Sequence, residues 1–187
     1  RVQSVLALLC FSFSYATAQV SLELSETDNF SERIQQDKRD IDAYVSLIKS
    51  NSDSSQFDVA LDYQKTALRY AGQSRDIIIL RTLGIIAKSG LGKLDKAEAE
   101  YKRAFKINGA QTNVALHIAM SEAYLKFKQL DKAKIAVATA LKANPADKQS
   151  ITLLTRLLEI EKAILVTGNV LAYDESIKRS QVAGLLI

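Results

Sequence analysis

Cysteine, proline and tryptophan are nearly missing from this sequence of 187 residues, which has one Cys, one Pro, no Trp, one Met and seven Gly. A single Cys excludes a disulfide-stabilised scaffold. The hydrophobic content of 48% is too high for a disordered chain, and no apolar run approaches the roughly 20 residues of a membrane-spanning helix. Because Gly and Pro are scarce while Ala, Leu, Lys and Glu are abundant, we expect a globular chain built from helices.

The first 18 residues have the pattern of a targeting segment. Arg1 is basic, residues 5–15 are apolar apart from two serines, and Ala16-Thr17-Ala18 provides small residues where a signal peptidase cleaves. We therefore expect a signal peptide over residues 1–18 and export to the periplasm or cell envelope. The alternative is an uncleaved N-terminal anchor helix. Cleavage before Gln19 would remove Cys10, the only thiol of the chain.

A repeated motif occupies the middle of the chain. The tetrapeptide Leu-Asp-Lys-Ala stands at residues 94–97 and again, 36 residues later, at 130–133. A weaker copy ends at Ala60, so that the three motif alanines are spaced by 37 and 36 residues. Seven residues after each of them comes a further alanine: Ala67, Ala104 and Ala140. A fixed spacing of this size is typical of stacked structural repeats.

The repeated pattern resembles the tetratricopeptide repeat family, whose unit is a pair of antiparallel helices in about 34 residues. The best copy carries the family's large, small and aromatic positions as follows: Leu80, Leu83, Gly84 and Ala87 on the first helix, and Leu94, Ala97, Tyr101, Ala104 and Phe105 on the second. The resemblance implies an all-α fold, an α-solenoid of about three helix-turn-helix repeats over residues 41–147. An acidic leader at 19–40 would precede it, and a C-terminal capping helix and tail at 148–187 would follow.

The resemblance also implies a concave groove lined by the first helix of each repeat. Carried over residue by residue, it assigns these partner-binding positions: Ile78, Arg81, Ile85, Lys88 and Ser89 from the second repeat, and Ala115, Ile118, Glu122, Leu125 and Lys126 from the third. Such a groove combines an apolar floor with basic rims, which suits an amphipathic helix or an acidic peptide. The alternative is that the chain's own acidic leader or apolar tail fills it.

Charge is distributed unevenly along the chain. Residues 19–63 carry a net charge of −6, whereas residues 64–147 carry +8. The basic repeats favour a negatively charged partner, either another protein with an acidic or amphipathic segment or anionic lipid head groups, although many of these lysines are explained more simply as a solvated outer face. We expect no binding to nucleic acid, because basic residues do not alternate with aromatic residues that could stack on bases.

Two features of the sequence superficially suggest a catalytic, metal or nucleotide site, but neither has the residues that such a site needs. His117 is the only histidine, and neither Met120 nor Glu122 completes a metal site with it. Residues 87–93 superficially resemble a phosphate-binding loop, but Leu94 stands where that loop needs a hydroxyl group. We therefore expect no catalytic residue, no metal and no cofactor, and interpret His117 as a packing residue.

Three function classes follow from the sequence. We favour a non-catalytic interaction scaffold or assembly factor of the bacterial cell envelope. The alternative is a structural subunit of a larger membrane-associated complex, which docks through its helical faces or through the apolar end at residues 182–187. An exported enzyme is the third class, suggested only by His117. The oligomeric state and the identity of the partner stay open.

Overall fold

The computed structural model describes residues 29–167, and over this range the chain consists of helices and turns without a strand. Residues 29–36 form a short helix before the main elements. Those elements are α2 (Ile41–Asp53), α3 (Phe57–Tyr70), α4 (Ser74–Gly90), α5 (Leu94–Phe105), the 3-10 turn η1 (Ala110–Thr112), α6 (Val114–Lys126), α7 (Leu130–Ala143) and α8 (Lys148–Thr167). The predicted signal peptide and the apolar end at 182–187 lie outside the described residues.

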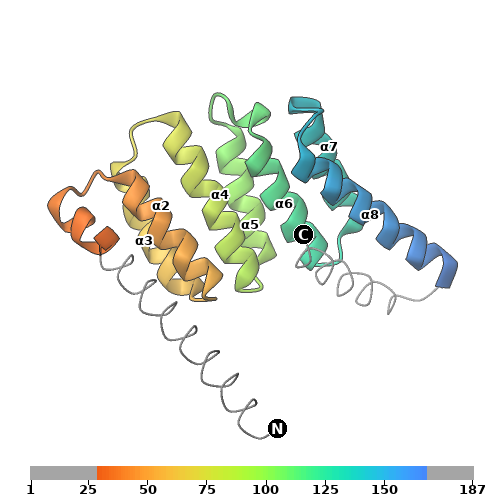
Figure 1. Cartoon of the computed structure of the whole chain (residues 1–187), viewed down its shortest axis with the longest axis horizontal. Helices are drawn as coiled ribbons and strands as arrows, with labels where there is room; N and C mark the ends of the chain where they lie inside the picture. The colour runs from red at the N-terminus through yellow and green to blue at the C-terminus, as the bar shows by residue number, and fades with distance from the viewer. Residues whose placement is uncertain (1–28, 168–187) are drawn as a thin grey trace, which may run out of the picture.

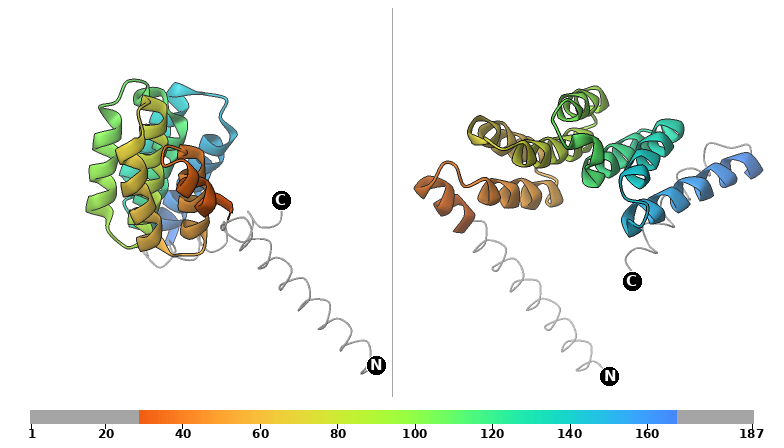
Figure 2. Two further views of the ribbon diagram at one scale, coloured as in Figure 1. Left: turned by 90° about the vertical axis from the view of Figure 1, so that its left-hand side faces the viewer. Right: turned by 90° about the horizontal axis from the view of Figure 1, so that it is seen from above.

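The helices form antiparallel pairs that follow one another in a row (Figure 1). The pairs are α2 with α3, α4 with α5, and α6 with α7, and α8 packs against the last pair. The right-hand view of Figure 2 shows the same succession from above. The prediction of an all-α solenoid of helix-turn-helix repeats is therefore confirmed.

Small residues allow the two helices of each pair to approach closely. The motif alanines Ala60, Ala97 and Ala133 are fully buried, and so are the alanines seven residues further on: Ala67, Ala104 and Ala140. Seven residues are two helical turns, so each pair of alanines lies on one face of its helix. The repeated alanines of the sequence are thus the positions at which the second helices pack.

The turn inside each pair has the same backbone geometry. One residue adopts a left-handed conformation in each turn: Ser55 with φ 60°, Gly92 with φ 75° and Lys128 with φ 59°. These residues are 37 and 36 positions apart, like the motif alanines. Only glycine adopts this conformation without a steric penalty. The turn geometry is therefore the same in all three pairs, although Ser55 and Lys128 are less suited to it than Gly92.

Three of the four helices α2, α4, α6 and α8 begin with a side-chain cap. Asp40 accepts a hydrogen bond from the Ala43 amide at 3.0 Å, Asn113 from the Leu116 amide at 2.9 Å, and Asp147 from the Ser150 amide at 2.7 Å. Each cap satisfies an amide that the helix itself leaves free. The distance in sequence from Asn113 to Asp147 is 34 residues, so α8 begins as another first helix would.

The hydrophobic core consists of three clusters in series. The first joins α2, α3 and α4, the second joins α4, α5 and α6, and the third joins α6, α7 and α8. Each cluster contains one pair and the first helix of the next pair. The first helices therefore link neighbouring repeats, as in other stacked-repeat proteins.

Candidate functional site: a groove and a charged cleft

A groove runs across the first helices of successive pairs. One part is a depression of about 380 Å³ between α2, α4 and α6, and another of about 360 Å³ lies between α6 and α8. Glu122 and Gln149 line both depressions, which makes the groove continuous. We call this surface the inner groove. Its lining includes Val45, Lys49, Ile79, Thr82, Leu83, Ile86, Ala115, Ile118, Ala119, Glu122, Gln149, Thr152, Leu153 and Arg156.

The lining of the inner groove repeats at fixed spacing. Residues 79, 82, 83 and 86 of α4 recur 36 positions later as residues 115, 118, 119 and 122 of α6. A further 34 positions lead to residues 149, 152, 153 and 156 of α8. Four equivalent positions on each of three helices thus form one wall, and α8 extends it in the register of a first helix.

This spacing corrects the predicted register of the second repeat. Ile78 and Ile85 are 4% and 0% exposed and belong to the core cluster shared with α5 and α6. Arg81 and Lys88 lie on another side of α4, and Ser89 is buried with its hydroxyl donating to the Ile86 carbonyl. None of these five residues lines the inner groove. The prediction aligned Gly84 with Ser121, a spacing of 37, whereas the groove positions repeat at 36.

The prediction for the third repeat places more residues on the inner groove. Ala115, Ile118 and Glu122 line it. Leu125 is 4% exposed and packs in the core between α7 and α8. Lys126 is exposed and donates a hydrogen bond to the Gly90 carbonyl at 3.3 Å, next to the turn of the preceding pair. The structure therefore brings three of these five residues together.

The inner groove is apolar in the middle and charged towards its ends. Val45, Ile79 and Ile86 contribute apolar surface from α2 and α4, and Lys49 stands at the α2 end. Lys148 and Arg156 provide positive charge at the α8 end. Glu122 keeps an exposed side chain, but partial desolvation by the surrounding groove residues raises its pKa, and the charge of Arg156 opposes this shift. Glu122 is thus the one carboxylate among the described lining residues of the groove, and it shares the α6–α8 depression with Arg156.

A second depression, of about 530 Å³, lies between α3 and α5, with α4 as its floor. We call it the α3–α5 cleft. Its lining is Leu61, Asp62, Gln64, Lys65, Leu68 and Arg69 from α3, Arg81 and Lys88 from α4, and Glu100 and Arg103 from α5. Seven of these ten side chains are charged. The cleft therefore differs in character from the apolar centre of the inner groove.

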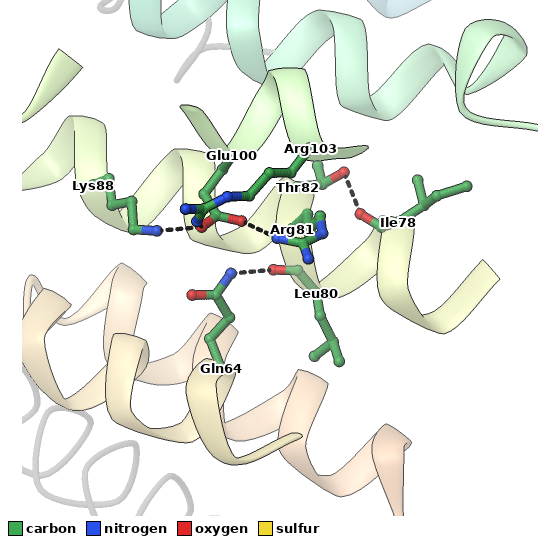
Figure 3. Close-up of polar contacts among 8 residues, drawn as sticks. All are labelled: Gln64, Ile78, Leu80, Arg81, Thr82, Lys88, Glu100 and Arg103. Carbon is green, nitrogen blue, oxygen red and sulfur yellow. Dashed lines mark hydrogen bonds and ion pairs between the residues drawn. The ribbon is translucent and has the colours of Figure 1, made fainter. Parts of the chain in front are cut away.

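Glu100 is the centre of an ion-pair cluster in the α3–α5 cleft (Figure 3). Its side chain is 4% exposed, and it accepts hydrogen bonds from Arg81 Nη1 and Lys88 Nζ, both at 2.7 Å, and from Arg103 Nη1 at 3.1 Å. Burial opposes ionisation of Glu100, but the hydrogen bonds and charges of Lys88 and Arg81 outweigh it and lower the pKa of this carboxyl. The cluster thus joins α4 to α5 through charge.

Gly84 lets α3 pack closely on the same side of α4. The buried amide of Gln64 donates to the Leu80 carbonyl at 3.1 Å, as Figure 3 shows. A Cβ atom at position 84 would lie 2.7 Å from Cδ of Gln64, which is too close for a real contact. This explains why the Leu-Gly pair of the sequence motif is needed at this position.

Comparison with known families supports the repeat assignment. The family model described as tetratricopeptide repeat matches residues 90–157, which run from the end of α4 into α8. Over these residues the chain is similar to tetratricopeptide repeat proteins. No curated protein was found to match the chain. The match covers the pair α6 and α7, together with α5 and half of α8.

Within this matched segment, His117 is a packing residue held by two hydrogen bonds. It is fully buried, with Nδ1 2.7 Å from the Tyr101 hydroxyl and Nε2 3.0 Å from the Gln111 carbonyl. A carbonyl only accepts, so Nε2 carries the proton and Nδ1 accepts from Tyr101. Burial lowers the pKa of His117, with the Gln111 hydrogen bond opposing it, which favours this neutral tautomer.

Neither a metal site nor a membrane-spanning helix is found in the part of the chain that the structure describes. Over residues 29–167, no three or more His, Cys, Asp and Glu side chains are grouped so that they could hold a metal ion. Within the same range, every helix is too short or too polar to cross a bilayer.

Sequence reasoning missed most of the groove lining on α2, α4 and α8: Val45, Lys49, Ile79, Thr82, Leu83, Ile86, Gln149, Thr152, Leu153 and Arg156. The signal that could have found those on α4 was present. The Leu-Asp-Lys-Ala motif repeats at 36 residues, and the same spacing leads from the α6 positions back to α4. The side chains of α8 could be found only by treating Asp147 as a cap equivalent to Asn113.

Proposed function

We propose that this protein is a non-catalytic interaction scaffold or assembly factor of the bacterial cell envelope that binds a peptide or helix in its inner groove. Tetratricopeptide repeats in general support a role in protein–protein interaction. The observation that carries the proposal is the regular lining of the groove by three or more first helices. A wall of equivalent positions suits an elongated ligand, because side chains spaced along the ligand meet the same environment repeatedly.

The charge pattern indicates what the ligand presents. Apolar side chains from α2 and α4 favour an apolar stripe on the ligand, whereas Lys49, Lys148 and Arg156 favour acidic groups near its ends. An amphipathic segment with acidic flanks meets both requirements. This agrees with the type of partner expected from the basic charge of the repeats.

Site-specific photo-crosslinking in intact cells tests the groove. Thr82 lies in the inner groove, and Thr139 lies on α7 outside it; each hydroxyl donates to the carbonyl four residues earlier. A photoreactive residue at position 82 is expected to give a discrete crosslinked product, and one at position 139 is expected to give none. The product at position 82 should disappear when Ile86→Asp is added.

The matched control for that substitution is Ile135→Asp. Ile86 is 38% exposed in the groove, and Ile135 is 68% exposed on α7. Both variants replace an exposed isoleucine by aspartate, so a general effect on stability or solubility would affect both. Equal crosslinking at position 82 in the two variants would count against the groove as the binding surface.

Export is a separate part of the proposal and has its own test. Residues 1–18 resemble a signal peptide, with small residues before Gln19. Intact mass of the protein recovered from the cell envelope is expected to correspond to a chain that begins at Gln19. A mass that includes residues 1–18 would support the anchored form instead.

A second candidate function, a structural subunit of a larger complex, is favoured by the outer face of α8. Ile151, Leu158 and Leu165 are 46%, 49% and 79% exposed and follow one another at seven-residue spacing. In register with α6, Ile151 corresponds to the fully buried His117. A helix with an apolar stripe, contributed by another subunit, would cover this face as a second helix covers the first helices of the described pairs.

The two functions predict different consequences of changing α8. Leu158→Glu should release the protein from its complex without affecting the crosslink at position 82 if α8 carries a structural contact. Loss of the crosslink with an intact complex, after Ile86→Asp, would favour the groove function.

A further inference from the structure

The α3–α5 cleft contains more positive charge than the chain itself neutralises. Five of its side chains are cationic and two are acidic, which leaves a net charge of +3. Glu100 accepts from three of the cations, Arg81, Lys88 and Arg103. One carboxylate surrounded by three cations is itself a site with excess positive charge, and the partial burial of Arg81 and Lys88 weakens screening by water.

Several hydrogen-bond donors of the cleft lack an acceptor within the described part of the chain. Arg81 Nε is buried without a hydrogen-bond partner. Lys65 and Arg69 line the α3 side, are exposed and form no ion pair with any residue of 29–167. The cleft lining thus combines two unpaired cations of α3 with one unsatisfied N–H group of Arg81, whose guanidinium is otherwise paired with Glu100.

This charge cluster does not follow from the repeat. The positions of Arg81 and Glu100 correspond, 37 residues earlier, to Tyr44 and Tyr63, whose rings lie 6.4 Å apart. Thirty-six residues later they correspond to His117 and to an alanine. Helix packing at this place is therefore achieved by aromatic or neutral side chains in the other two repeats, and only the second repeat uses charge.

We propose that the α3–α5 cleft is a binding site for a phosphate group, separate from the inner groove. Arginine presents its N–H donors in a planar fork that fits phosphate oxygens, and lysine adds positive charge. Donors from α3, α4 and α5 surround the cleft, which suits a tetrahedral anion better than a planar carboxylate. A phosphate dianion reduces the net charge of the lining from +3 to +1.

Titration calorimetry with inorganic phosphate, at an ionic strength kept constant with chloride, tests the site. The chain is expected to bind one phosphate saturably. Lys65→Gln combined with Arg69→Gln should weaken binding about tenfold or more, since the variant loses two cationic hydrogen-bond donors to the phosphate oxygens. Both residues are exposed and lie outside the Glu100 cluster, so the fold is retained, as circular dichroism would verify.

The matched control is Lys38→Gln combined with Lys142→Gln. These lysines are also exposed, form no ion pair within residues 29–167 and lie outside the cleft. The control removes the same net charge and should bind phosphate like the unchanged chain. Absence of saturable binding to the unchanged chain, or an equal loss in both double variants, would overturn the proposal.

Sedimentation with lipid vesicles distinguishes two sources of the phosphate group. If the natural ligand is a lipid headgroup, the chain should bind vesicles containing phosphatidylglycerol, inorganic phosphate should compete, and the Lys65 and Arg69 double variant should lose binding. If the source is a soluble phosphate, calorimetric binding should persist without vesicle binding. Vesicle binding that phosphate does not reduce, and that the double variant retains, would argue against the cleft.

Discussion

The two sides of helix α4 differ in almost every physical property, although they are separated by single positions in the sequence. Thr82 and Ile86 face the inner groove, while Arg81 and Lys88 face the α3–α5 cleft. Successive residues of a helix are rotated by about 100°, so adjacent residues belong to different faces. An error of one position in the repeat alignment therefore replaces residues of the groove wall by residues of the core and of the charged cleft.

The difference between the two sides shows which surface features recur from one repeat to the next. The groove side of α4 has equivalents on α6 and α8 at constant spacing. The cleft side has none, because the corresponding residues elsewhere are aromatic or neutral. In this molecule the groove is a property of the repeat, and the charged cleft is a property of the second repeat alone.

The largest expected effect comes from removing the carboxylate of the cleft. Glu100→Ala leaves Arg81 and Lys88 partly buried without their counter-charge, which should lower the free energy of unfolding by about 3 kcal/mol. Urea denaturation measures it. Glu98→Ala is the control, because Glu98 pairs with the exposed Lys132 and should cost less than about 1 kcal/mol. Equal losses in the two variants would mean that the cluster adds no stability of its own.

A smaller effect is expected on the same side of α4 from Gly84→Ala. The added methyl group would collide with the buried Gln64 and push α3 away from α4, at a cost of about 2 kcal/mol. Gly72→Ala provides the comparison, since no atom lies within 4 Å of a Cβ at that position. Thermal unfolding of the two variants should differ clearly, and similar melting temperatures would contradict the close approach described here.

The stability of the chain should respond to pH in opposite directions through Glu100 in the α3–α5 cleft and Glu122 in the inner groove. The pKa of Glu100 is lowered in the folded chain, so its stabilising contribution is present above its ordinary value of 4.5 and is lost as the pH falls through the lowered pKa. The pKa of Glu122 is raised, so its ionisation opposes folding above 4.5, and this opposition disappears as the pH falls. Glu100→Gln should therefore flatten the loss of stability in acid, and Glu122→Gln should steepen it. Denaturation between pH 3 and pH 7 would show whether the signs are opposite.

The smallest effect on stability is expected on the groove side. Ile86→Ser removes an isoleucine that is 38% exposed, and should change the free energy of unfolding by no more than about 1 kcal/mol. Affinity for a groove ligand should nevertheless fall, because the apolar centre of the groove loses surface. A large loss of stability would show that Ile86 serves the core rather than binding.

The sequence was sufficient for the fold and for part of the groove. Alanines at two spacings, seven residues within a helix and 36 or 37 between repeats, report helix packing directly, because only small residues fit there. The register of α4 could not be read in the same way. From the motif alone, Gly84 would be aligned with Ser121. The structure shows instead that Gly84 faces Gln64 of α3. These residues are 20 positions apart in the chain, so no local pattern reveals the contact. The cleft depends on residues from three helices, and no local pattern brings them together.

The serial arrangement of the three core clusters has a consequence for how the chain opens. Each cluster joins only helices that are neighbours along the row, and no cluster contains residues of both α2 and α8. Unfolding free energy in such a molecule varies with position along the row, because the end helices have neighbours on one side and α4 and α6 each belong to two clusters. Amide hydrogens of α4 and α6 should therefore exchange most slowly, and the two ends of the inner groove should open independently of each other.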